Sequence, residues 1–126
     1  EILIGLVGSE MCIRDRIAAN ESCVIVGRCA DYALADEPHC LNIFIRSNMD
    51  DRIKRISERL NVPENKAKDI IKKKDKERSS YYNYYTSKKW GDARSYDLCL
   101  NTSQISVEDS IELILKYREC MRNHNK

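Results

Sequence analysis

Three short apolar runs, each followed by a stretch with helical periodicity, constrain the fold of this chain most. The runs cover residues 22–26, 41–45 and 96–100 and are rich in Val, Ile and Leu. Apolar runs of this length are typical of strands that are buried on both faces, as in parallel sheets. Because strands and helices alternate along the chain, the sequence predicts an α/β fold with helices packed on a parallel sheet.

Three helices are predicted after residue 47, and each has a recognisable start. Ser47 or Asn48 can cap the first, Pro63 suits the first turn of the second, and Ser106 can cap the third. Their apolar side chains recur at helical spacing: Met49, Ile53, Ile56 and Leu60, then Ala67, Ile70 and Ile71, then Val107, Ile111, Ile114 and Leu115. We expect residues 122–126 to form a frayed tail.

Residues 1–16 form a leader that we expect to be foreign to the protein. Residues 5–16 resemble translated adaptor DNA from a sequencing library, since residues 6–15 can be read as CTC GTG GGC TCG GAG ATG TGT ATA AGA GAC. The leader also imitates a phosphate-binding loop after a strand, but it lacks the Lys-Ser/Thr that ends a P-loop. We therefore expect one native domain over residues 17–121.

Positive charge is concentrated in the middle of the chain. Residues 52–94 contain 14 Lys or Arg and six Asp or Glu, which predicts an anionic partner such as nucleotide phosphate, nucleic acid or a membrane surface. The leader is too short to span a membrane and has no secretion signal, so we expect no membrane association. The cysteines show no zinc or C-x-x-C spacing, which indicates reduced thiols, a cytoplasmic location and no protein metal site.

The first candidate site follows the first apolar run. Gly27 and Arg28 stand at the expected carboxyl end of a strand, where open α/β sheets bind ligands. The planar guanidinium of Arg28 suits a phosphate, and Asp31 could orient Arg28 or accept a hydrogen bond from a base or sugar. A glycine turn with a surface ion pair explains the same residues equally well.

Two further basic clusters lie on the predicted helices. Arg52, Arg55 and Arg59 share one helix face, and Lys74 and Arg78 follow on the next helix. Each cluster alone is typical of a solvated surface. Together with Arg28 they could surround a transferring phosphate, because phosphoryl transfer requires several cations in a site that excludes water. A basic helical segment over residues 52–94 would then act as a lid.

Tyrosines gather after these clusters and allow a second interpretation. Tyr81, Tyr82, Tyr84 and Tyr85 could stack on the bases of a single-stranded nucleic acid. We favour packing in the core or under the lid.

The motifs then resemble those of the cytidylate kinase-like family, relatives of nucleoside monophosphate kinases with the P-loop NTPase fold. The similarity runs from about residue 20 to 118. The matching segments are residues 23–32, Ile43-Phe44-Ile45 with 51–56, 75–78 with Tyr81-Tyr82 and Tyr85-Thr86, Trp90-Gly91-Asp92, and 96–103. The resemblance implies a three-layer α/β/α fold with a parallel sheet.

The resemblance also implies a role for each candidate residue. Gly27, Arg28 and Asp31 would hold the nucleoside monophosphate. Arg52 and Arg55 would lie near the base and phosphates of ATP, with Asn101 and Thr102 beside the adenine. Arg78, with Lys74, would reach the transferring phosphate. The reaction implied is ATP plus CMP or dCMP giving ADP plus the diphosphate, with Mg²⁺ on the ATP phosphates.

The chain departs from the family at its N-terminus. The glycine-rich phosphate loop and the first strand are expected upstream and are missing here, so we expect an incomplete fold and an inactive fragment. Gly-Arg-Cys-Ala also differs from the Gly-Arg-Asp of cytidylate kinases, which leaves the acceptor nucleotide open. The alternatives are a nucleotide-binding pseudokinase and a basic, tyrosine-rich nucleic-acid-binding module. We favour a monomer that binds nucleotides rather than nucleic acid.

Overall fold

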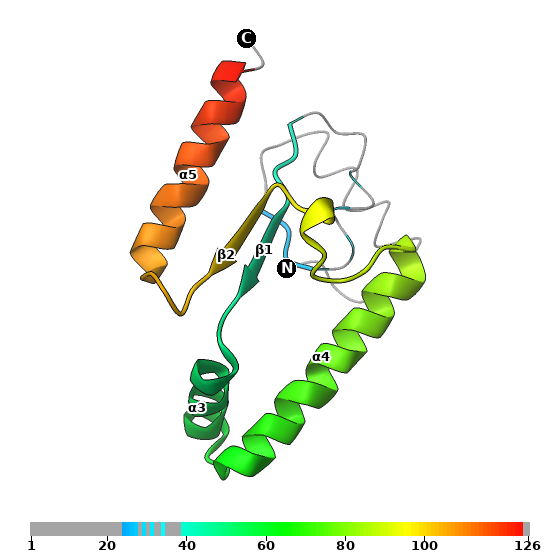
Figure 1. The fold of residues 1–126 in the computed structure, drawn as a ribbon, viewed down its shortest axis with the longest axis vertical. Helices are drawn as coiled ribbons and strands as arrows, with labels where there is room; N and C mark the ends of the chain where they lie inside the picture. The colour runs from blue at the N-terminus through cyan, green and yellow to red at the C-terminus, as the bar shows by residue number, and fades with distance from the viewer. Residues whose placement is uncertain (1–23, 28, 30, 32–33, 35–38, 125–126) are drawn as a thin grey trace.

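The computed structural model describes residues 24–27, 29, 31, 34 and 39–124 (Figure 1). Two strands and three helices follow one another in these residues. In chain order they are β1 (Ile43–Arg46), α3 (Met49–Leu60), α4 (Glu64–Thr86), the short 3₁₀ helix η1 (Ala93–Ser95), β2 (Leu98–Asn101) and α5 (Val107–His124). The predicted leader, residues 1–16, lies outside the described residues.

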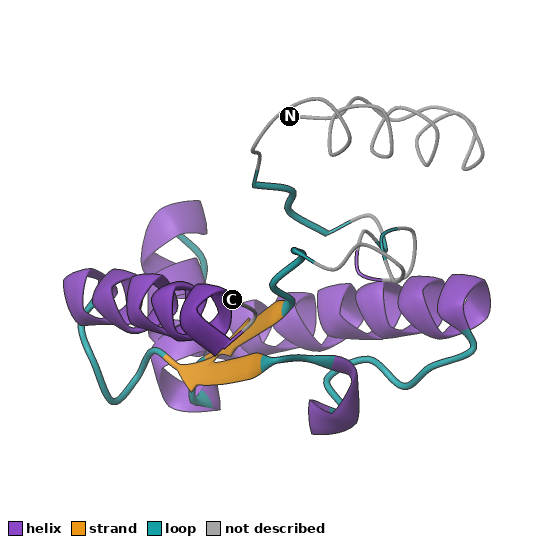
Figure 2. Cartoon of the chain, turned by 90° about the horizontal axis from the view of Figure 1, so that it is seen from above, coloured by secondary structure: helices purple, strands orange, loops and turns teal. Residues whose placement is uncertain are grey.

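The two strands form a parallel sheet, as predicted. β1 pairs with β2 in the register Ile43 with Leu98 through Arg46 with Asn101. A parallel pair needs a crossover connection, and α3 and α4 supply it. In the view of Figure 2 the strands lie side by side in the middle of the described residues, with helices around them. Both strands begin two residues later than predicted, and the α/β class is confirmed.

Helices α3 and α4 pack against each other across a tight connection. α3 ends at Leu60, and its C-cap Asn61 has the left-handed φ of 52° that favours asparagine or glycine. The Ser57 side chain donates a hydrogen bond of 2.6 Å to the carbonyl of Val62 and fixes the turn. Ala67 and Ile71 are buried on α4, so the predicted apolar positions of this helix form its packed face.

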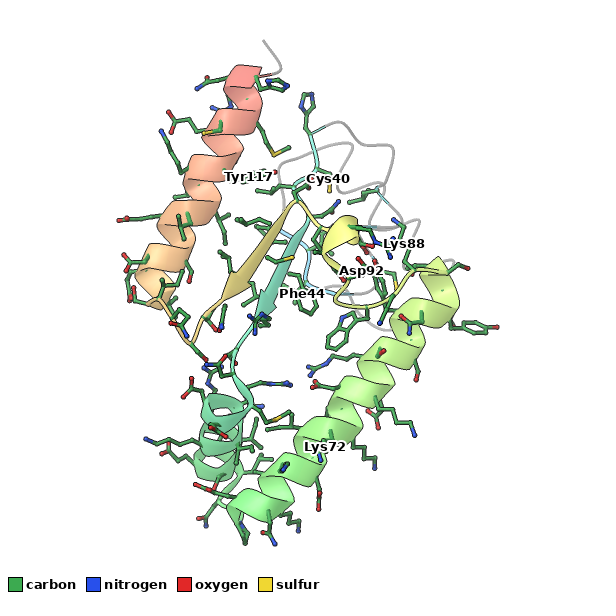
Figure 3. All side chains as sticks on the ribbon, in the orientation of Figure 1. Cys40, Phe44, Lys72, Lys88, Asp92 and Tyr117 are labelled. Carbon is green, nitrogen blue, oxygen red and sulfur yellow. The ribbon has the colours of Figure 1, made fainter. Side chains whose placement is uncertain are left out.

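An aromatic cluster fills the space beside β1. Phe44 has its ring centroid 5.3 Å from that of Trp90 and 5.0 Å from that of Tyr96. Gly91 has a φ of 82°, a conformation that favours glycine, and a Cβ there would lie at ordinary contact distance, 3.4 Å, from Phe44 Cζ. Figure 3 shows Phe44 on the side of β1 that faces η1 and α4.

Helix α5 begins at the predicted cap. The Ser106 hydroxyl accepts a hydrogen bond of 3.0 Å from the backbone N–H of Asp109. The helix continues to His124, past Arg122, where we had expected the tail to begin. Of the predicted apolar face, Val107, Ile111 and Leu115 are exposed.

The sequence predicts a first strand over residues 22–26. This prediction is wrong for residues 24–26, the part of that range that the structure describes. Val24, Ile25 and Val26 are not in a strand, and Val24 and Val26 are 93% and 86% exposed. A strand requires a hydrogen-bonded neighbour. Within the described part of the chain β1 pairs only with β2, so apolar sequence alone does not form a third strand here. The three-layer arrangement stays a prediction.

Candidate functional site

The structure brings together two of the predicted phosphate-binding arginines. Arg52 on α3 donates hydrogen bonds of 2.8 and 2.7 Å from Nη1 and Nη2 to the two carboxylate oxygens of Asp75 on α4. Arg78, one helical turn after Asp75, also donates to Asp75 Oδ1. We call Arg52 and Arg78 the lid arginine pair. The two guanidinium groups meet at one carboxylate although 26 residues separate them in the sequence.

The electrostatics of this cluster follow from its hydrogen bonds. The bonds from Arg52, with a smaller contribution from Arg78, hold the pKa of the Asp75 carboxyl below its usual range. The bond to Asp75 in turn raises the pKa of Arg52. Arg52 and Asp75 have side chains 26% and 25% exposed, whereas Arg78 is 55% exposed. Arg78 is therefore the member of the pair that a phosphate in solution can reach.

The loop after α4 supports Arg78 from the other side. The Arg78 guanidinium lies 5.6 Å from the ring centroid of Trp90, within the range of a cation–π interaction. The Asn83 side chain accepts a hydrogen bond of 2.8 Å from the Trp90 backbone N–H, which ties this loop to α4. Trp90 is the single tryptophan of the chain, so its fluorescence reports on Arg78.

A second group of predicted residues lines an open hollow of about 340 Å³ between α3 and the loop after β2. We call it the α3–β2 hollow. Its lining residues are Asp51, Lys54, Arg55, Glu58, Thr102 and Ser103. Arg55 and Thr102, both predicted to bind ATP, thus lie at one place. Asn101 lies at the end of β2 but is not among the lining residues.

Hydrogen bonds fix the two walls of the hollow to each other. The side chain of Asn101 donates to Asn48 Oδ1 at 3.1 Å, and the Asn48 backbone N–H donates to Ser103 Oγ at 2.8 Å. Asn48 is the residue before α3, as predicted, but its side chain makes no capping bond to the helix. It binds Asn101 instead.

The predicted acceptor residues are described in part. Gly27 is exposed and lies in a bend of the chain with a φ of 70°. Arg28 lies outside the described residues. Asp31 is half-buried, and its Oδ2 accepts a hydrogen bond of 2.5 Å from the Tyr82 hydroxyl on α4. We call the described residues of 24–31 the acceptor segment and α4 the lid helix, after their predicted roles, and the Tyr82–Asp31 bond joins the two.

Lys74 does not join the lid arginine pair. Its side chain is 65% exposed, and its Nζ lies 3.6 Å from Glu77 Oε2 in a surface ion pair. Lys74 and Arg78 are four residues apart on α4, yet in this structure only Arg78 contacts Asp75. The role of Lys74 at the transferring phosphate stays a prediction.

Three residues that organise the site were not selected from the sequence: Asn48 as a link to β2, Asp75 and Tyr82. The sequence could have indicated Asp75, because it is an acidic residue in a lysine-rich run and precedes Arg78 by three positions, the spacing of a helical ion pair. Tyr82 belongs to the matching pair Tyr81-Tyr82, but nothing in the sequence indicated its partner Asp31, which is 51 residues away.

The described residues show neither a metal-binding cluster nor a membrane-spanning helix. The described residues contain no group of three His, Cys, Asp or Glu side chains that could hold a metal ion. None of the helices found there combines the length and the apolar character needed to cross a bilayer.

Comparisons with known proteins show the family and a solved structure of similar fold. A crystal structure of an uncharacterized protein from Eubacterium ventriosum ATCC 27560 is 36% identical in sequence, with a TM-score of 0.85. The match covers 90% of this chain and 65% of that one, so the chain spans about two thirds of that neighbour's length. None of the curated proteins matches the chain. The model of the cytidylate kinase-like family matches residues 7–104, a range that holds the lid arginine pair, Asp31 and Thr102, and the chain belongs to that family.

Proposed function

We propose that this chain carries the lid and the ATP-base side of a nucleoside monophosphate kinase. In the intact protein the reaction would be ATP plus CMP or dCMP giving ADP plus the diphosphate. Family membership supports a nucleotide kinase-like protein. The choice of acceptor rests on the family resemblance.

The lid arginine pair is the observation that carries the proposal. Phosphoryl transfer depends on cations placed around the transferring group, and arginine binds phosphate oxygens in pairs. Here Arg52 and Arg78 come from two helices to one carboxylate, and Arg78 remains 55% exposed. A phosphate near Arg78 would meet a guanidinium that Trp90 holds from the other side, and it would compete with Asp75 for that guanidinium.

The α3–β2 hollow supports a place for the ATP base. The guanidinium of Arg55 can stack on a planar base, and the Thr102 and Ser103 hydroxyls can donate or accept hydrogen bonds with its edge. Lys54 and Arg55 balance Asp51 and Glu58, so the hollow is close to neutral. A neutral site suits an uncharged base better than a phosphate.

Mg²⁺ is implied by the reaction on the ATP phosphates, and the described residues contain no group of three His, Cys, Asp or Glu side chains that would hold it. The sequence has four glycines, at positions 5, 8, 27 and 91, and none begins a P-loop ending in Lys-Ser/Thr. Without that phosphate cradle the chain as given should transfer no phosphate. Incubation with ATP, Mg²⁺ and CMP, dCMP, UMP or AMP checks this, and diphosphate formed above a blank would contradict it.

Binding is the sharper test of the site. We expect ATP and inorganic tripolyphosphate to bind by calorimetry and to change Trp90 fluorescence, because both draw on Arg78. Arg78→Gln should weaken tripolyphosphate binding about tenfold or more, the effect of losing a charge-assisted hydrogen bond. Arg94→Gln is the matched control, since Arg94 is 88% exposed and pairs only locally with Asp92.

Two outcomes would overturn the proposal. Equal effects of Arg78→Gln and Arg94→Gln would show that tripolyphosphate binds through general positive charge. Binding of single-stranded RNA or DNA far more tightly than ATP, with an affinity that falls steeply with salt, would instead identify the nucleic-acid-binding module.

A further inference from the structure

Tyr82 joins the lid helix to the acceptor segment by one short hydrogen bond. Its hydroxyl donates to Asp31 Oδ2 at 2.5 Å, across 51 residues of sequence. Tyr82 is 6% exposed and Asp31 is half-buried, so the bond is largely shielded from water. Shielding matters because a hydrogen bond to a carboxylate is strong where water does not compete for it.

The phenol of Tyr82 is itself held in place. Its ring stacks on Tyr96, with centroids 6.5 Å apart and an interplanar angle of 25°. The Tyr96 hydroxyl accepts a hydrogen bond of 3.4 Å from the Gly91 backbone N–H. Burial, and next the bond to Asp31, raise the pKa of the Tyr82 phenol. The phenol therefore stays protonated and remains a donor over the whole physiological range.

We propose that Tyr82 is a positioning residue that holds the Asp31 carboxylate in the orientation needed to bind the acceptor nucleotide. The inference rests on the proposed function, because it takes Asp31 as part of the acceptor site. It goes further by assigning a residue of the lid helix to acceptor recognition.

The physical reason is the cost of orienting a carboxylate. A carboxylate with no hydrogen-bond partner samples several rotamers, and each one lost on binding reduces affinity. Tyr82 fixes one oxygen in advance, which leaves the other oxygen of Asp31 directed for a hydroxyl or amino group of the acceptor. Tyr82 lies on α4 with Arg78, so one helix would serve both the acceptor and the transferring phosphate.

The test is Tyr82→Phe in the full 126-residue chain, with CMP and ATP affinities measured by calorimetry. Phenylalanine keeps the ring that stacks on Tyr96 and removes only the hydroxyl. We expect CMP binding to weaken about tenfold, the scale of one charge-assisted hydrogen bond, and ATP binding to stay unchanged. Tyr84→Phe is the matched control, because Tyr84 lies on the same helix and is 79% exposed.

Asp31→Asn completes a double-mutant cycle. If Tyr82 acts through Asp31, adding Tyr82→Phe to Asp31→Asn should weaken CMP binding no further. Tyrosine labelled with ¹³C at Cζ gives a spectroscopic check, since the resonance missing in Tyr82→Phe should shift in Asp31→Asn and on adding CMP. A merely structural role for Tyr82 would lower CMP and ATP affinity together.

The possible failures are distinguishable. CMP binding of equal strength in the parent chain and Tyr82→Phe overturns the role of Tyr82 and leaves the proposed function standing. Additive losses in the double variant overturn the action through Asp31. If the parent chain binds ATP but no CMP, the acceptor part of the proposed function fails, and the role of Tyr82 fails with it.

Discussion

Replacing Asp75 by asparagine should make the chain less stable and, at the same time, a better binder of phosphate. Asp75 accepts two hydrogen bonds from Arg52 and one from Arg78. Asparagine keeps one acceptor oxygen and loses the charge. Both arginines would then be released from an internal anion and would be available to an external one.

The loss of stability can be scaled from the structure. A buried hydrogen bond to a charged group contributes about 1.5 to 3 kcal/mol. The Arg52 and Asp75 side chains are about one quarter exposed and Arg78 more than half exposed, so solvent screening reduces the total. Asparagine also retains part of the interaction with Arg52. We expect a net loss of about 1 to 2 kcal/mol, or about 4 to 8 °C in Tm for a domain of this size.

The pH dependence gives an independent check with a defined sign. The pKa of Asp75 is lower in the folded than in the unfolded chain. Its contribution is therefore complete above the ordinary aspartate pKa of about 3.9 and is lost as the pH falls through the lower, folded value. The stability difference between the parent chain and Asp75→Asn should be constant near neutral pH and should shrink below about pH 4.

Thermal unfolding by circular dichroism measures the first effect and tripolyphosphate calorimetry the second. Tripolyphosphate affinity should rise several-fold in Asp75→Asn, because the phosphate no longer competes with a carboxylate. Glu119→Gln is the control, since Glu119 and Lys116 form an exposed ion pair on α5. Lower stability combined with weaker tripolyphosphate binding would refute the reasoning, because it would mean that Asp75 orients the arginines for phosphate rather than occupying them.

Two further predictions concern the fold. Gly91→Ala should lower the free energy of unfolding in urea by about 1 to 3 kcal/mol, because Gly91 has a φ of 82°, which residues with a Cβ rarely adopt. Since the added Cβ would lie at ordinary contact distance from Phe44, an unchanged free energy of unfolding would show that the backbone there relaxes without cost. Ser106→Ala should reduce stability by about 1 kcal/mol through loss of the cap on the Asp109 N–H. Ser106→Asp, which restores an acceptor, should recover most of it, and failure of that rescue would contradict the capping role.

The sequence predicted the helices better than the sheet, and the reason is physical. Helix starts depend on neighbours in sequence, and Ser106 makes the bond to Asp109 that its position predicts. A strand depends on a partner that local sequence does not specify. The two apolar runs that form β1 and β2 pair with each other. Val24 and Val26 of the remaining run are exposed and belong to no strand.

The candidate site, like the fold, could be predicted only in part from the sequence. Residue type and the family resemblance were sufficient to select Arg52, Arg55, Arg78 and Thr102, which the structure gathers at two places. Residue type and resemblance did not identify the carboxylate and the hydroxyl group that hold the site residues in place. Asp75 and Tyr82 matter because they bind residues of other segments, Arg52 and Asp31. Those contacts form only after α3, α4 and the acceptor segment have packed together.

The parallel pairing of β1 and β2 also determines the order in which the chain can fold. Phe44 pairs with Cys99 across 55 residues, and the whole of α3 and α4 lies between them. Closing a loop of that length is slow and entropically costly, whereas α3 and α4 meet across a short turn. The helical pair should therefore form first and bring the strand ends together. Helical signal should return early in refolding, and Trp90, which packs against Phe44 beside the sheet, should reach its native fluorescence in a later, slower phase.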